Sequence, residues 1–182
     1  MNRVIVIEGP DGAGKSTLVK AIKAADPSVE TIHPGKPPKD YSTLLRMLND
    51  QLQVGLAPNR VYDRLTCISE WVYRPFRIDI NDNQINEQSV YVSLLEAHIV
   101  LSMHMKWTIV YCRPDIDTIL EHCDKFTEHD TEETIAVVKM NIADVVQRYD
   151  VLMTQLALFG CQIVQYDYSQ QDTFEFIKEI LE

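Results

Sequence analysis

Residues 9–17 read GPDGAGKST, and this spacing of glycines before a lysine and a serine suits the binding of a triphosphate. The glycines let the backbone curl so that successive N–H groups face phosphate oxygens. Lys15 is expected to reach the β- and γ-phosphates, and the Ser16 hydroxyl is expected to hold Mg²⁺. The residues predicted to bind ATP are therefore Gly9, Pro10, Asp11, Gly12, Ala13, Gly14, Lys15, Ser16 and Thr17.

The segments on either side of this loop match the structure that it needs. The apolar run Val4–Ile7 indicates a buried strand, and the residues from 15 to about 25 indicate a helix. The positive end of the helix dipole would add to the attraction for an anion at the loop. This context favours a bound triphosphate over a glycine-rich turn that holds no ligand.

A second candidate for chemistry is the pair Asp63 and Arg64, which ends a short strand-like run and precedes a helical one. A carboxylate in this place, near a phosphate-binding loop, can organise Mg²⁺ or the attacking group. The planar guanidinium of Arg64 is always charged and fits a phosphate with two parallel hydrogen bonds. Such a pair is often only a surface or capping feature, but behind this loop it predicts a catalytic set of Lys15, Asp63 and Arg64.

The elements that must position these residues alternate between strand and helix, which favours a parallel α/β sheet. Strands are predicted at Val4–Ile7, Val29–Ile32, Arg60–Tyr62, Trp107–Tyr111 and Gln162–Tyr166, and helices near 15–25, 41–53, 66–74, 84–104, 115–123, 131–158 and 171–181. Ligands of open α/β sheets bind beyond the carboxyl ends of the strands. Because Gly9, Pro34 and Asp63 each follow such an end, we expect them to converge.

Composition limits the class of protein. The length of 182 residues suits one domain, predicted over 1–182, and 46% hydrophobic with 24% charged residues is typical of a globular chain. The net charge of −10 opposes broad binding to nucleic acid phosphates. The four cysteines are widely spaced, which predicts reduced thiols in the cytoplasm and no zinc cluster. No signal peptide is expected before the first strand, and charged and histidine residues interrupt the apolar stretch 90–105, which argues against a membrane span.

Residues 8–17 and the Asp63-Arg64 pair together resemble the thymidylate kinase group of nucleoside monophosphate kinases, in the form of a divergent, phage-type member. Pro34-Gly35-Lys36 is a weaker match, where the family has a basic residue after the second strand. The resemblance implies the P-loop NTPase fold, with a five-stranded parallel sheet flanked by helices. It also implies ATP and Mg²⁺ as cofactors, a homodimer, and phosphoryl transfer to a deoxynucleoside monophosphate, first of all dTMP or a related pyrimidine nucleotide.

The same resemblance assigns roles to the matching residues. On the donor side, Asp63 would join Ser16 at the metal. On the acceptor side, Asp11 would approach the 3′-hydroxyl of the sugar, and Arg64 would bind the acceptor phosphate. Lys36 would assist Arg64 in the place of a family arginine.

The segment 120–134 corresponds to the lid of the family, which normally carries arginines, and it contains none. His122, Lys125 and His129 are its basic residues, and Lys125 is the lid candidate for meeting the charge of the transferred group. Loss of an arginine with that role can slow transfer by several orders of magnitude. Three possibilities stay open: Lys125 replaces the arginine, transfer is slow, or an arginine from elsewhere serves. The reserves, meaning arginines outside the lid that could meet this charge, are Arg74, Arg77 and Arg148.

Several residues are candidates for contacting the acceptor base. The family builds its base pocket between the second and third strands, where this chain offers Tyr41 and Arg46. Trp71 and Arg74 share a face of a predicted helix, with Tyr73 close by, and are substrate-binding candidates for a pocket wall. Stacking on an aromatic ring stabilises a bound base by roughly 1–3 kcal/mol. Trp71 fits a core position equally well, and the pattern does not choose.

Glu8 supports an alternative acceptor. A glutamate directly before the loop also resembles deoxynucleoside kinases, in which it acts as a base toward a 5′-hydroxyl. A hydroxyl must lose its proton during transfer, whereas a phosphate oxygen is already ionised. Glu8 is therefore a further substrate-binding candidate. Asp63 stands where those kinases carry a glutamate before their arginine, and this difference favours a monophosphate acceptor.

Two further functions stay as alternatives. A nucleotide-binding module without acceptor transfer would keep the loop, although the absence of an Asn-Lys-x-Asp sequence gives no support to a GTPase switch. A kinase of a hydroxymethylated base in DNA would gain from a basic surface, which the net charge of −10 opposes. The expected partners are a nucleotide substrate and a second copy of the chain, and not a membrane or nucleic acid.

Overall fold

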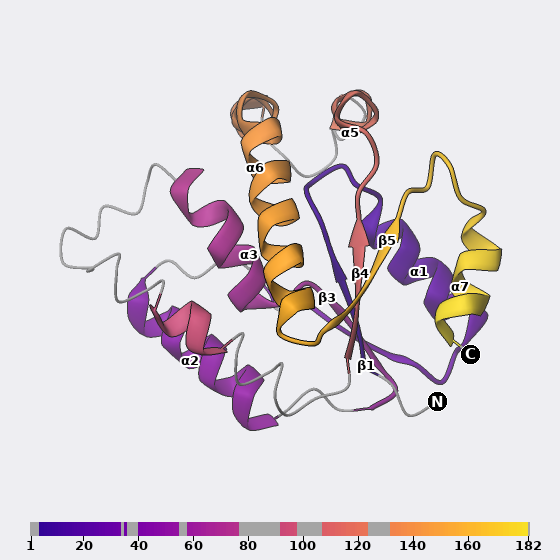
Figure 1. Ribbon diagram of the computed structural model, residues 1–182, viewed down its shortest axis with the longest axis horizontal. Coiled ribbons are helices and arrows are strands. Elements are labelled where there is room, and N and C mark those ends of the chain that lie inside the picture. The colour runs from indigo at the N-terminus through magenta and orange to yellow at the C-terminus, as the bar shows by residue number, and fades with distance from the viewer. Residues whose placement is uncertain are drawn as a thin grey trace.

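The structure is a computed structural model that describes residues 4–33, 35, 40–54, 58–76, 92–97, 107–123 and 132–181. Its centre is a sheet of five parallel strands in the order β2-β3-β1-β4-β5 (Figure 1). The strands are β1 (Val4–Glu8), β2 (Glu30–Ile32), β3 (Arg60–Asp63), β4 (Trp107–Cys112) and β5 (Gln162–Tyr166). The parallel sheet predicted from the sequence is confirmed, and each strand lies where it was expected.

The register of the sheet aligns the strand ends that matter. Ile7 of β1 pairs with Asp63 of β3 on one side and with Val110 of β4 on the other. The central strand β1 is buried along its whole length, as expected for a parallel strand that is covered on both faces. The segments that leave β1 and β3 therefore start side by side at the carboxyl end of the sheet.

Helices cover both faces of this sheet (Figure 1). They are α1 (Lys15–Ala25), α2 (Tyr41–Val54), α3 (Thr66–Tyr73), α5 (Ile116–Cys123), α6 (Glu132–Leu158) and α7 (Thr173–Leu181), with a 3₁₀ turn at Arg74–Phe76. Residues 92–97 are also helical, and the rest of the helix predicted at 84–104 lies outside the described residues. Within the described part of the chain, no helix is both long and apolar enough to cross a membrane.

The side chains of β1 alternate between two cores, as the period of a strand requires. Val4 and Val6 pack into a cluster with residues of α2, α3 and α6. Ile5 and Ile7 pack into a second cluster with residues of α1 and α7. The two clusters hold the sheet between two layers of helices.

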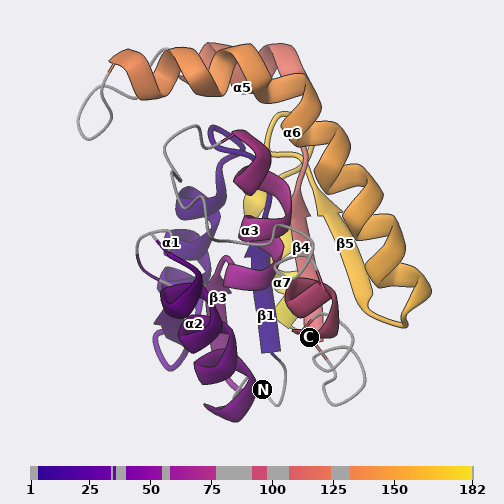
Figure 2. The same cartoon turned by 90° about the vertical axis from the view of Figure 1, so that its left-hand side faces the viewer.

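The helices α5 and α6 contribute to the end of the molecule where the strands stop. Figure 2 shows α5 and the first part of α6 lying across that end of the sheet. They are joined by a small apolar cluster of Ile119, Cys123, Ile142 and Val146. The lid predicted at 120–134 falls in this region, and its residues 124–131 lie outside the described residues.

Candidate active site

The loop after β1 has a conformation that favours glycine, as Gly9 and Gly14 show. Gly9 has a φ of 143° and Gly14 a φ of 80°, both in a region that L side chains rarely adopt. A Cβ at Gly9 would collide with the carbonyl oxygen of Cys112 at the end of β4. A Cβ at Gly14 would lie 2.7 Å from the ring of Tyr168. The loop is therefore packed closely between the sheet and the segment that follows β5.

Lys15, at the start of α1, folds back over the loop. Only 6% of its side chain is exposed, and its ammonium group donates a hydrogen bond to the carbonyl oxygen of Pro10. The Asp11 carboxylate lies 4.0 Å from the same ammonium group. Burial, together with the positive charge of Arg64, lowers the pKa of Lys15 to about 8. The lysine is thus held at the loop, where a bound phosphate would favour its charged form.

Arg64 leaves the end of β3 through a strained turn. Its φ of 76° is left-handed, a conformation that costs a non-glycine residue on the order of 1–3 kcal/mol. The Arg64 N–H donates to the carbonyl oxygen of Ile7 at 3.0 Å. The turn carries the guanidinium across to the loop, where it pairs with the Asp11 carboxylate and lies 5.4 Å from the ring centre of Tyr73. Sequence motifs 53 residues apart thus meet at one point.

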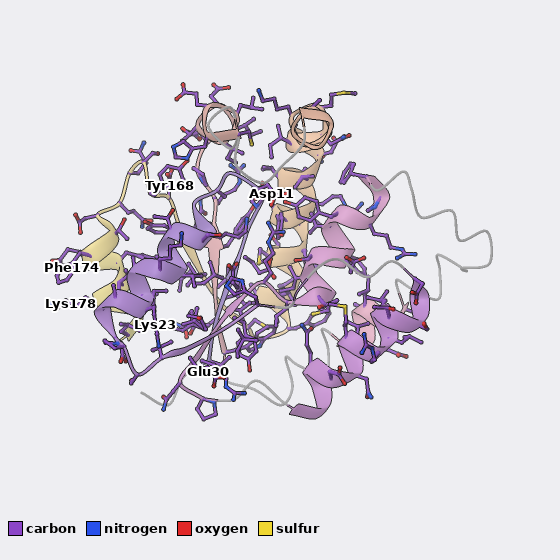
Figure 3. All side chains as sticks on the ribbon, turned by 180° about the vertical axis from the view of Figure 1, so that it is seen from behind. Asp11, Lys23, Glu30, Tyr168, Phe174 and Lys178 are labelled. Carbon is purple, nitrogen blue, oxygen red and sulfur yellow. The ribbon has the colours of Figure 1, made fainter. Side chains whose placement is uncertain are left out.

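Asp11 is the half-exposed member of this group. Its side chain is 45% exposed, and its backbone N–H donates to the Tyr73 hydroxyl at 2.9 Å. Although partial burial acts to raise its pKa, Arg64 and Lys15 hold the pKa of Asp11 below its ordinary value. Figure 3 shows Asp11 and Tyr168 toward the end of the molecule that carries α5 and α6, with Glu30 at the other end. The group therefore lies at the carboxyl end of the sheet, where ligands of this architecture bind.

Glu8, the last residue of β1, is fully buried beneath the loop. One carboxylate oxygen accepts the N–H of Leu65 at 2.6 Å, and the other accepts the Tyr149 hydroxyl at 3.2 Å. Burial raises the pKa of Glu8 to about 7, against the opposing effect of Arg64 and Lys15. The structure thus places Glu8 in contact with the backbone after Arg64 and not at an open surface.

Asp63 and Ser16 are the predicted metal ligands. The Asp63 side chain is 7% exposed, and its Oδ2 lies 3.1 Å from Nδ1 of His33, which is exposed at the end of β2. Ser16 is exposed in the first turn of α1. Among the described residues, no group of three or more acidic, cysteine or histidine side chains could hold a metal by itself. This donor set fits Mg²⁺, which is usually held by substrate phosphates, waters and one or two protein oxygens.

Three aromatic or imidazole side chains join the site without having been assigned these roles from the sequence. Tyr73 accepts the Asp11 N–H, Tyr149 donates to Glu8, and His33 pairs with Asp63. The position of His33 directly after a strand could have indicated it. Tyr149 lies 141 residues from Glu8, and nothing in the local pattern of its helix distinguishes it from a core residue.

The candidates from α3 have partners in the protein interior. Trp71 is partly buried and packs against the core shared with α6. Arg74 is buried and lies 3.9 Å from the carboxylate of Glu70, one turn earlier. Arg148 donates to the carbonyl oxygens of Trp71 at 2.6 Å and Val72 at 3.1 Å. Arg74 and Arg148, two of the reserves for the lid arginine, are thus both engaged with α3.

No protein-family model and no curated protein sequence matches the chain. A solved structure of the YorR protein from Bacillus subtilis, in complex with phosphorylated GDP, is similar with a TM-score of 0.68 and 19% identity, over 97% of this chain and 92% of the other. Deoxyadenosine kinase from M. mycoides with bound dATP is similar with a TM-score of 0.60 and 17% identity, over 100% and 99% of the two chains. The same kinase with bound dCTP gives 0.56 and 19%, over 97% and 96%. The chain has the P-loop NTPase fold.

Within this P-loop NTPase fold, an aromatic pair connects α5 to the phosphate loop. The rings of His122 and Tyr168 stack with centroids 5.0 Å apart and 5° between their planes, and the hydroxyl lies 2.6 Å from Nδ1. The Tyr168 ring is the neighbour of Gly14 described above. The predicted contributions of Lys36 and Lys125, and the reserve Arg77, lie outside the described residues.

Proposed function

We propose that the protein transfers the γ-phosphoryl group of ATP, with Mg²⁺, to a deoxynucleoside monophosphate, first of all dTMP or a related pyrimidine nucleotide. The observation that carries this proposal is the placement of Arg64. A strained turn brings its guanidinium across to the phosphate loop, beside Asp11 and Lys15. A lysine for the donor phosphate and a planar fork for a second phosphate are the groups that transfer between two phosphates requires.

The proton-accepting groups support a phosphate acceptor. Asp11 is accessible but is a weak base, because Arg64 and Lys15 hold its pKa below the ordinary value. Glu8, with a pKa of about 7, is basic enough but is fully buried. A hydroxyl acceptor needs a base within reach of its proton, whereas a phosphate monoester brings an ionised oxygen. The described carboxylates of the loop therefore favour an acceptor that needs no base.

The mechanism follows from these positions. An oxygen of the acceptor phosphate attacks the γ-phosphorus in line, and the bond to the β-phosphate oxygen breaks. Arg64 orients the acceptor phosphate and offsets its repulsion from ATP, while Lys15 and the loop N–H groups stabilise the charge on the transferred group. Ser16 and Asp63 would hold Mg²⁺, which would supply positive charge to offset the negative charge of the phosphates.

A deoxynucleoside kinase is the second candidate, and the pKa of Glu8 is the observation that favours it. A general base works best with a pKa near the working pH, and about 7 meets that condition. For this role Glu8 would have to exchange its contacts with Leu65 and Tyr149 for a contact with the acceptor hydroxyl.

An acceptor panel with radiolabelled ATP tests both candidates. We expect transfer to deoxynucleoside monophosphates, with dTMP among the best, and little transfer to nucleosides. Turnover of thymidine without turnover of dTMP would overturn the first candidate in favour of the second. ATP binding without transfer to any member of the panel would favour a binding module. Lys15→Ala is the control, because it should abolish transfer whichever acceptor is used.

We also propose that the protein forms a homodimer, as the resemblance to thymidylate kinases implies. Exposed apolar side chains on α6 support this, with 51% of Val151 and 82% of Leu158 exposed in the single chain. Light scattering on the purified protein should give twice the mass of one chain, and the mass of a single chain at micromolar concentration would contradict the proposal.

A further inference from the structure

The Glu8 carboxylate is placed as a structural anchor and not as a base. It has no exposed surface, and both of its oxygens accept hydrogen bonds from protein groups. A general base must come within about 2.6–3.2 Å of the proton that it removes, directly or through one water. In this structure the group at that distance from one oxygen of the Glu8 carboxylate is the Leu65 N–H, at 2.6 Å.

The Leu65 N–H belongs to the turn that aims Arg64. Two consecutive amides of this turn are fixed to two consecutive residues of β1. The Arg64 N–H is bonded to the Ile7 carbonyl oxygen, and the Leu65 N–H is bonded to the Glu8 side chain. A left-handed arginine persists only where its surroundings determine it. The side chain of Glu8 is thus one of the two attachments that keep the turn in place.

Tyr149 holds the carboxylate from the other side. Its hydroxyl donates to the second oxygen of Glu8 at 3.2 Å, and its ring packs edge-on against Tyr73, with centroids 6.1 Å apart. Tyr73 in turn lies under the Arg64 guanidinium. The carboxylate and the guanidinium are therefore supported by the same pair of tyrosines, and Glu8 can affect Arg64 through two routes.

We propose that Glu8 is a positioning residue: held by Tyr149, its carboxylate locks the Arg64-Leu65 turn so that Arg64 is presented to an anionic acceptor, and it takes no part in proton transfer. This inference rests on the proposed kinase function and deepens it, because a site without a working base requires an acceptor oxygen that is already ionised. Glu8 belongs to the acceptor side of the site, although it directly precedes the loop that binds ATP.

The variant Glu8→Gln separates a lock from a base. The glutamine oxygen can still accept the Leu65 N–H but cannot remove a proton, so we expect kcat and the KM for dTMP within about fivefold of the wild type. Glu8→Ala leaves the Leu65 N–H buried and unpaired, and we expect the KM for dTMP to rise roughly tenfold or more with the KM for ATP unchanged. A fall in kcat of roughly 100-fold or more in Glu8→Gln, as for removal of a base, would overturn the proposal.

A matched pair of tyrosines tests the second half of the lock. Tyr149→Phe removes the hydroxyl bonded to Glu8, and Tyr111→Phe removes a hydroxyl bonded to Asp150 in the same ring stack. We expect only Tyr149→Phe to raise the KM for dTMP. Equal effects in the two variants, or an effect of Tyr149→Phe on ATP alone, would show a general packing role and overturn the proposal.

A double variant tests whether Glu8 acts through Arg64. If it does, Glu8→Ala should add little to the rise in KM for dTMP that Arg64→Ala already causes, whereas independent roles would make the effects multiply. Hydrogen exchange at the Leu65 amide gives a readout that needs no activity. We expect strong protection in the wild type and Glu8→Gln and loss of protection in Glu8→Ala. Fast exchange in the wild type would overturn the lock, whereas failure of the acceptor panel would overturn the kinase function and leave this readout standing.

Discussion

At the scale of single residues, the site is an arrangement of opposite charges in which Asp11 is half-exposed and the others are largely buried. Lys15 and Arg64 lie among Asp11 and Glu8, and each shifts the protonation of its neighbours. Burial makes these interactions stronger than the same pairs would be at the surface. A single substitution here therefore changes the charge state of several groups at once.

Tyr73→Phe isolates one hydrogen bond to the phosphate loop. It removes the oxygen that accepts the Asp11 N–H and keeps the ring under Arg64. We expect kcat/KM for the acceptor to fall roughly fivefold, which corresponds to a net hydrogen bond of about 1 kcal/mol. Initial rates at varied dTMP measure this. Tyr166→Phe, which removes a hydroxyl bonded to Thr173 at the start of α7, should have no effect, and equal effects would contradict the assignment.

Lys15 should make ATP binding dependent on pH. In the free protein its pKa is about 8, and a bound triphosphate favours the charged form, so binding takes up a proton above that pH. The Kd for ATP should therefore rise as the pH increases from 8 toward 9.5, as measured by titration calorimetry. Lys15→Arg keeps its charge throughout this range and should remove the pH dependence. A flat profile in the wild type would contradict the shift.

At the scale of elements, one stretch of α6 ties three parts of the site together. Arg148 bonds to the last carbonyl groups of α3, Tyr149 bonds to Glu8 of β1, and Asp150 pairs with Arg113 after β4 at 3.0 Å. Because α6 also extends to the end of the molecule where α5 lies, it links the region of the predicted lid with the buried residues beneath the phosphate loop (Figure 2). Through these three consecutive residues α6 supports the candidate site.

Arg148→Ala distinguishes this support from a role in transfer. Loss of the bonds to Trp71 and Val72 should lower the free energy of unfolding by about 1–3 kcal/mol while kcat at a permissive temperature stays near the wild-type value. If Arg148 replaced the missing lid arginine, kcat would instead fall roughly 1,000-fold or more. Thermal melts and initial rates separate the two. Arg60→Ala, at an exposed pair with Glu30, should change stability by less than about 1 kcal/mol.

At the scale of the whole molecule, the chain has a net charge of −10, whereas the candidate phosphate site carries the positive charges of Lys15 and Arg64. The acidic surface acts over long range and is screened by salt, whereas Lys15 and Arg64 act at short range from a largely buried position. A chain that repels polyanions can therefore still hold a nucleotide. Burying these charged groups lowers the free energy of unfolding of the whole fold.

The pH dependence of stability reveals the effect of burying the Glu8 carboxyl. Its pKa rises from 4.5 in the unfolded chain to about 7 in the fold, so between these values the folded state binds more protons and stability falls as pH rises. The loss is complete above about pH 7 and is on the order of 3 kcal/mol. Glu8→Gln lacks this group, so its free energy of unfolding relative to the wild type should increase from pH 5 to pH 8. Denaturant unfolding at the two values checks this, and a constant difference would contradict the raised pKa.

The sequence determined the parts of this protein that depend on short stretches of chain. The glycine pattern of residues 9–17 specifies the phosphate loop, because glycine adopts the backbone angles at Gly9 and Gly14 without the steric cost that a side chain would add. Apolar runs separated by helical patterns specify the parallel sheet, because strands buried on both faces are continuously apolar. The order of these elements also placed Asp63 and Arg64 at the end of the sheet that carries the loop.

Only the tertiary structure decided what those residues touch. Arg64 reaches Asp11 through a left-handed turn that arginine does not favour by itself, and the turn is held by contacts with β1. Tyr149 meets Glu8 from 141 residues away. Such contacts arise from packing between distant segments, so no local pattern encodes them. For the same reason the sequence predicted Glu8 only as a substrate contact, and the fold adds that its buried carboxylate accepts the Leu65 N–H.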